Sequence, residues 1–118
     1  MGRNKIQIAL LGIGALLVFA SVTAHADSAQ SNYTAFCAKC HGATGHGDGP
    51  GAAALSTKAR DFADCAVMQK ISDDTMFTVI KGGGAAAGLP ADMPSWSNGL
   101  SDPEIHALVA YIHTFCKK

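Results

Sequence analysis

The chain has few aromatic residues (7%) and few charged ones (15%), and its nine Lys and Arg residues balance nine Asp and Glu residues. The formal net charge is 0 with neutral histidines, so the sequence lacks the basic patch that nucleic-acid binding requires. No stretch stands out as a β-strand, whereas several show helical periodicity. These absences exclude a nucleic-acid-binding protein and favour an all-α domain.

The sequence is also poor in cysteine, with four in all. Cys37 and Cys40 form one closely spaced pair, but Cys65 and Cys116 are single and far apart. A structural zinc site would need a second pair of Cys or His ligands at similar spacing. A thioredoxin-like dithiol would need a βαβ setting, of which there is no sign. Zinc binding and dithiol chemistry are therefore the weaker interpretations of Cys37 and Cys40.

Residues 37–41 have the sequence Cys-Ala-Lys-Cys-His, which is the attachment sequence for c-type haem. The thiols of Cys37 and Cys40 would add to the two vinyl groups of the porphyrin from one edge of a helical turn. The next residue, His41, can then supply an imidazole nitrogen to the iron. The sequence predicts one covalently attached haem c, held by Cys37 and Cys40 and ligated by His41.

The first 26 residues have the features of an export signal. Arg3 and Lys5 precede an apolar run from Ile6 to Ala20, and Ala24-His25-Ala26 is a small-x-small cleavage pattern. The run is close to membrane-spanning length, so an uncleaved anchor is the alternative, but no basic stop-transfer cluster follows it. We expect residues 1–26 to be a cleaved signal peptide and residues 27–118 to form one periplasmic domain.

The remaining thiols, those of Cys65 and Cys116, suit such an oxidising compartment. With Cys37 and Cys40 taken by haem, they are the only pair left to form a disulfide, which we expect in the periplasm. Two separately buried thiols are the alternative.

Three helices are predicted in the mature part. The first runs roughly over residues 28–40, and a glycine-rich loop at residues 42–51 follows it. The second begins at Ser72, whose hydroxyl can cap it, and Gly82-Gly83-Gly84 ends it. The third begins with the capping box at residues 101–104, and its expected buried stripe comprises Ile105, Leu108, Val109, Ile112, Phe115 and Cys116.

A second iron ligand is expected from the loop between the last two helices, residues 83–99. The mature part offers six thioether or imidazole candidates: Met68, Met76, Met93, His46, His106 and His113. We expect Met68 and Met76 to pack in the core and the three histidines to be solvated. Met93 lies in the loop beside Pro94, and a loop can carry a thioether across the haem face. Met93 is therefore the predicted distal ligand.

Three motifs carry a family resemblance: Cys37–Gly42, Met93-Pro94-Ser95-Trp96 and Leu108–Ile112. In this order they resemble the motifs of small bacterial class I c-type cytochromes, and the resemblance covers residues 28–118. It implies an all-α fold of a few helices around one haem. The terminal helices would then cross through Tyr33, Leu108 and Tyr111.

The resemblance also implies roles for three further residues in the haem environment. Pro50 would supply the carbonyl that accepts a hydrogen bond from His41. Arg60 and Trp96 would lie near the haem propionates. The Cys65 and Cys116 pair is outside the general pattern of the family.

A haem iron with both His and Met ligands has no open position for a substrate or for oxygen, so we expect electron transfer and no enzymatic activity. The predicted function is that of a soluble periplasmic carrier that moves single electrons between a donor and an acceptor redox protein. We expect no small-molecule substrate, and membrane contact only through membrane-bound redox partners. The alternatives are a haem-based ligand-binding or sensor protein, or a cytochrome subunit docked to a dehydrogenase or oxidase.

We expect cleavage of the exported chain after Ala26, because the small residues at positions 24 and 26 fit the peptidase pattern. Intact-mass measurement of the mature protein should place its N-terminus at Asp27. A mature protein that still begins at Met1 would instead establish the uncleaved anchor.

Overall fold

The computed structural model describes residues 20–116, and this part of the chain is helical, with no strand within those bounds. The longer helices are α1 (Ala20–Asn32), α4 (Asp73–Gly82) and α5 (Asp102–His113), and the four-residue helices are α2 (Ala38–His41) and α3 (Cys65–Met68). A π-helical turn η1 (Tyr33–Cys37) and two 3₁₀ turns, η2 (Ala52–Ala54) and η3 (Gly84–Ala87), complete the order. The all-α fold predicted from the sequence is confirmed.

The first predicted helix is the helical run made by α1, η1 and α2, from Ala20 to His41. It begins before the predicted start at Ser28, so the expected cleavage point after Ala26 lies within α1. The apolar run that precedes Ala20 lies outside the described residues. The π-helical turn at Tyr33–Cys37 was not predicted, and it ends at Cys37, the first of the two cysteines expected to bind haem. Such turns interrupt α-helices mostly at functional positions.

The other two predicted helices are confirmed, together with their end signals. The Ser72 hydroxyl accepts a hydrogen bond from the backbone N–H of Thr75 at 3.1 Å, and α4 ends before Gly83, whose φ of 81° favours glycine. At the start of α5 the Ser101 N–H donates to the Glu104 carboxylate at 2.8 Å, as a capping box requires. This bond is the main cause of the lowered pKa of Glu104.

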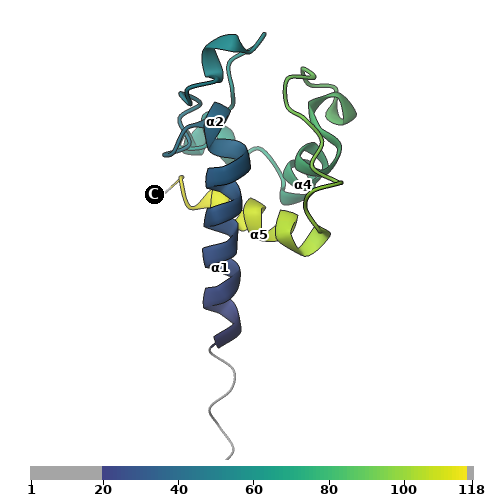
Figure 1. Cartoon of the computed structure of the whole chain (residues 1–118). Coiled ribbons are helices and arrows are strands. Elements are labelled where there is room, and N and C mark those ends of the chain that lie inside the picture. The colour runs from purple at the N-terminus through teal and green to yellow at the C-terminus, as the bar shows by residue number, and fades with distance from the viewer. Residues whose placement is uncertain (1–19, 117–118) are drawn as a thin grey trace, which may run out of the picture.

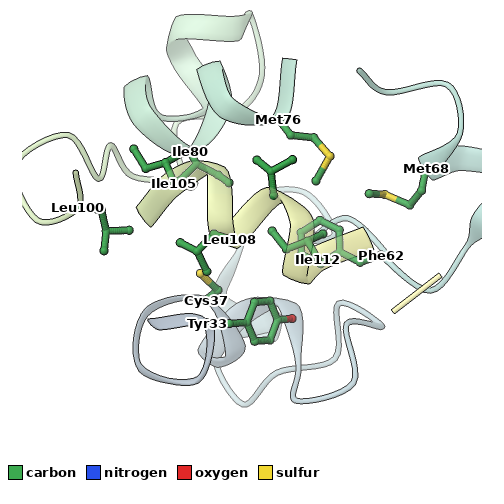
Figure 2. Close-up of a cluster of buried hydrophobic side chains, with 11 residues drawn as sticks. Tyr33, Cys37, Phe62, Met68, Met76, Ile80, Leu100, Ile105, Leu108 and Ile112 are labelled. Carbon is green, nitrogen blue, oxygen red and sulfur yellow. The ribbon is translucent and has the colours of Figure 1, made fainter. Parts of the chain in front are cut away.

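Helix α5 lies across α1 and contacts α4 on its other side (Figure 1). Four members of the predicted stripe are buried, whereas Phe115 and Cys116 follow the end of the helix and are half-buried. Figure 2 shows Leu108 between Tyr33 and Cys37 on one side and the side chains of α4 on the other. The buried core comprises Tyr33, Cys37, Phe62, Met68, Met76, Ile80, Leu100, Ile105, Leu108, Val109 and Ile112.

Tyr33, the first residue of η1, packs at the point where the N-terminal helical run crosses α5, as the family resemblance implied. Its ring lies 5.4 Å from that of Tyr111 and 4.9 Å from that of Phe115, measured between centroids. Its hydroxyl donates to the carbonyl of Gly42 at 2.8 Å. The side chain therefore joins the C-terminal segment to the residue that directly follows His41.

Helix α3 is tied to the end of the chain through Cys65 and Cys116, which the structure joins as a disulfide with Cα atoms 5.1 Å apart. In the described residues 20–116, no helix is both long enough and apolar enough to cross a membrane.

Candidate haem-binding site

The two thiols of the candidate site come from successive parts of one helical run. Cys37 ends the π-helical turn and is buried, and Cys40 lies half-buried in α2. Neither thiol is in a disulfide. Burial raises the pKa of the Cys37 thiol to about 11, so the group is an uncharged thiol at neutral pH. Both cysteines are thus free for thioether bonds to a porphyrin.

The alternative zinc interpretation gains no support from the fold. Within residues 20–116 no group of three or more His, Cys, Asp or Glu side chains is arranged to hold a metal ion. A structural zinc ion takes four such ligands, with cysteines bound as thiolates. The Cys37–Cys40 pair, which has no further metal-binding side chains grouped with it in the described residues, therefore fits haem attachment better than zinc binding.

His41 is held by two contacts with the segment that begins at Arg60. Its ring stacks on that of Phe62, with centroids 4.3 Å apart and planes inclined by 14°. Its Nδ1 lies 3.2 Å from the carbonyl oxygen of Arg60 and donates to it in the tautomer protonated at that nitrogen. This contact leaves Nε2 as the nitrogen that could bind a metal ion. Desolvation lowers the pKa of His41, and the hydrogen bond to Arg60 opposes this only partly, so the neutral form that binds metals is favoured.

The sequence-based prediction that Pro50 supplies the carbonyl at His41 is corrected by the structure, in which Arg60 supplies it. The physical reason is the packing of the segment 59–62 against the glycine-rich loop. The Phe62 N–H donates to the Gly45 carbonyl at 2.6 Å, and a Cβ built on Gly47 would meet the Ala59 carbonyl at 2.5 Å. This close approach brings the Arg60 carbonyl within reach of the imidazole.

Pro50 lies exposed in the glycine-rich loop, which covers the C-terminal end of α2. The N–H groups of Gly47, Gly49 and Gly51 donate to the carbonyls of His41, Cys40 and Lys39 at 2.8, 3.1 and 2.8 Å. They satisfy carbonyls that a helix end leaves without an intrahelical partner. The glycine repeat thus fixes the backbone of residues 37–41, the expected haem-attachment segment.

The two residues expected near the propionates occupy different positions. The Arg60 side chain is exposed, and its backbone carbonyl makes the contact with His41. Trp96 is half-buried, and its ring centroid is 5.1 Å from that of Phe36, the residue before Cys37. Trp96 is therefore adjacent to the attachment segment.

Met93 is half-buried and packs against the core cluster that includes Phe62. Its carbonyl accepts a hydrogen bond from the N–H of Gly84 at 2.9 Å, which holds Met93 against the η3 turn at the start of the loop of residues 83–99. A Cβ on Gly84 would lie 2.1 Å from the carbonyl oxygen of Pro90, so only glycine permits this close approach.

The other five candidates for the distal position have structural contacts of their own. Met68 and Met76 are 2% and 6% exposed and belong to the core, as predicted. His46 lies 3.4 Å from the carboxylate of Asp61, His106 stacks on Phe77, and His113 lies 2.8 Å from the carboxylate of Asp73. Met93 is the candidate that the loop between α4 and α5 presents.

The side chains present fit a covalently bound haem. They are two unbridged thiols on one helical run, a neutral imidazole whose Nδ1 is hydrogen-bonded to the Arg60 carbonyl, and a thioether on a loop. Residues 24–112 match the family described as cytochrome c oxidase, cbb3-type, subunit III. The chain belongs to this family of c-type cytochromes. Among solved structures it is similar to the KustC0563 c-type cytochrome, with 29% identity and a TM-score of 0.63 over 75% of this chain and 98% of that one. No curated protein matches the chain.

Sequence reasoning missed Phe62 and the backbone role of Arg60, although both are part of this cytochrome's candidate site. Neither has a local signal, because a stacking ring and a carbonyl acceptor depend on which segment folds against His41. The all-α cytochrome c fold and the family inferred from the three motifs are both confirmed.

We expect Gly49→Ala to destabilise the protein, because its Cβ would lie 2.3 Å from the carbonyl oxygen of Lys39 in α2. The loop must then move off the helix end, at a cost of about 1–3 kcal/mol for an overpacked site. Urea unfolding of the holoprotein measures this loss. Gly99→Ala is the matched control, since the nearest atom to its Cβ is 4.0 Å away. Equal unfolding midpoints for the two variants would contradict the role assigned to Gly49.

Proposed function

We propose that the exported chain binds one haem c through Cys37 and Cys40, with His41 and Met93 as axial ligands, and carries single electrons between redox proteins in the periplasm. The observation that carries this proposal is the arrangement at His41, whose Nδ1 is bonded to the Arg60 carbonyl and whose Nε2 is left for iron, in a helical run that also carries two unbridged thiols. Membership of a c-type cytochrome family supports it. In this proposal residues 1–26 are the signal peptide that directs export.

The haem would supply a one-electron couple of its iron, and the chain's residues would set the environment of that couple. Phe62 and the Arg60 carbonyl hold the imidazole of His41 in one orientation. A thioether ligand from Met93 favours Fe(II) and raises the reduction potential relative to a second histidine. With His41 and Met93 both bound to the iron, the site would have no place for a substrate. Electron transfer is the function that this ligand set supports.

The partners in this proposal are a donor and an acceptor redox protein. Residues 27–118 contain seven Lys and Arg against nine Asp and Glu, a formal charge of −2. So small a charge gives little long-range steering, and partner recognition would rest on local apolar contacts. The segment of residues 85–92 is exposed and contains Leu89, which is 44% exposed.

A second candidate function is that of a cytochrome subunit docked to an oxidase or a dehydrogenase. The family match favours it, since the family's description names an oxidase subunit. Both candidates assign the same chemistry to the site. Co-purification from solubilised membranes separates them, because a docked subunit elutes with its enzyme and a free carrier elutes alone.

We propose further that Cys65 and Cys116 form a disulfide in the exported protein, as the 5.1 Å between their Cα atoms permits. The bond would fasten α3 to the segment that follows α5.

Met93→Ala should abolish the long-wavelength absorption band of the ferric protein that signals thioether–iron ligation. The variant should also have a lower reduction potential and bind carbon monoxide readily when ferrous, because it lacks the sixth ligand. Met76→Leu is the control, since Met76 is 6% exposed and packs in the core. An unchanged spectrum in Met93→Ala would contradict the ligand assignment, and ready binding of carbon monoxide by the wild type would favour a ligand-binding protein.

The double variant Cys65→Ser with Cys116→Ser should unfold more easily by about 2–4 kcal/mol, the usual contribution of a disulfide. Its haem content should match that of the wild type, since Cys37 and Cys40 are unchanged. Thiol titration of the denatured, unreduced wild-type holoprotein should find no free thiol. Two free thiols would refute the bridge.

A further inference from the structure

The loop that carries Met93 is fastened to α4 and η3 on one side. The backbone N–H of Gly84 donates to the Met93 carbonyl at 2.9 Å, and the backbone N–H of Trp96 donates to the Ile80 carbonyl at 3.1 Å. The Ser95 hydroxyl donates to the Lys81 carbonyl at 2.7 Å. The bonds from Ser95 and Trp96 hold the C-terminal flank of the loop to α4, and the bond from Gly84 closes the loop on itself.

On its other side the same loop is hydrogen-bonded through Asp92. Its Oδ2 accepts two hydrogen bonds from Ser56, one from the backbone N–H at 2.9 Å and one from the side-chain hydroxyl. The two residues are 36 positions apart in the chain. Ser56 lies between η2 and Arg60, in the segment that continues to the carbonyl at His41. The Ser56–Asp92 contact therefore connects the Met93 loop to the segment that holds His41.

We propose that Asp92 is a positioning residue for Met93, and that the Ser56–Asp92 contact keeps the loop closed with Met93 on the iron. The inference rests on the proposed ligation by Met93. Asp92 is the residue before Met93, so a carboxylate fixed at this point restricts the backbone that carries the thioether. Two donors on one ionised oxygen make this contact stronger than a bond between neutral groups.

The energetic consequence follows from the exposure of the loop. Asp92 and Ser56 are exposed, and so are all of residues 85–92. Segments with few buried contacts open locally at low free energy, so hydrogen bonds of this kind decide how often they open. A ligand that competes with Met93 binds only the open form, and its apparent binding rate is proportional to the open fraction.

The test compares Asp92→Ala and Ser56→Ala, singly and together, with the wild-type holoprotein. Asp73→Ala is the matched control, because Asp73 also accepts a hydrogen bond between elements, from His113 Nε2 at 2.8 Å, but lies at the start of α4. It loses the same charge and a comparable contact without touching the Met93 loop. The measurement is the rate of carbon monoxide binding to the ferrous protein, with the thioether–iron band of the ferric protein recorded beside it.

Asp92→Ala should bind carbon monoxide about tenfold faster than the wild type, the factor that corresponds to about 1.4 kcal/mol in the opening equilibrium. Ser56→Ala should have a smaller effect, because its backbone N–H remains. The double variant should not exceed Asp92→Ala, since both changes remove the same contact. Asp73→Ala should bind at the wild-type rate.

Rates within twofold of the wild type for Asp92→Ala would overturn the inference, and so would an equal acceleration in Asp73→Ala. Failure of the proposed function gives a different result. If the wild-type ferric protein lacks the thioether–iron band, Met93 is not the ligand, and the inference falls with that assignment. If the band is present and Asp92→Ala changes nothing, the ligand stands and only the role of Asp92 is refuted.

Discussion

The architecture depends on the packing of Tyr33 between the N- and C-terminal helices. Its ring is 1% exposed and contacts Tyr111 and Phe115, while its hydroxyl donates to the Gly42 carbonyl at 2.8 Å. Burial raises the phenol pKa, so the hydroxyl remains a neutral donor. One side chain thus fixes three parts of the molecule: the helix that presents Cys37, the turn after His41, and the end of the chain. Rotation of the attachment helix would break the ring contacts and leave a buried polar group unpaired, which is costly.

Helix α5 transmits this constraint to the opposite side of the domain. Its buried stripe packs on Tyr33 and Cys37 with one face and on Met76 and Ile80 of α4 with the other (Figure 2). The Met93 loop is hydrogen-bonded to the carbonyls at the end of α4. The two proposed axial ligands, His41 and Met93, therefore come from segments whose relative positions are set by packing on the same helix, α5. Neither segment forms a site alone, which explains how a chain this short specifies a cofactor site.

The features that the sequence predicted are those with local causes. Ser72 and Ser101 cap helices through neighbours three residues away, and Gly83 ends α4 through its own backbone conformation. The π-helical turn at Tyr33–Cys37 has no such local signal. The Arg60 carbonyl at His41 was missed for a related reason: the family pattern pointed to Pro50, but the close approach of Gly47 to Ala59 brings a later segment to the imidazole. A backbone acceptor has no sequence signature, so only the tertiary arrangement identifies it.

The two sides of the proposed iron site are held by different physical means. On the proximal side His41 stacks on Phe62, which is 9% exposed, and Phe62 belongs to the core that Tyr33 organises. On the distal side Met93 is half-buried against the core, but the neighbouring residues 85–92 of its loop are exposed, and hydrogen bonds hold that part of the loop. Core packing keeps stabilising a side chain until the core itself opens. An exposed hydrogen bond, in contrast, can be replaced by hydrogen bonds to water at a small cost in free energy. Changes of solvent or surface sequence should therefore reach the haem through Met93, and His41 should keep its orientation as long as the core is intact.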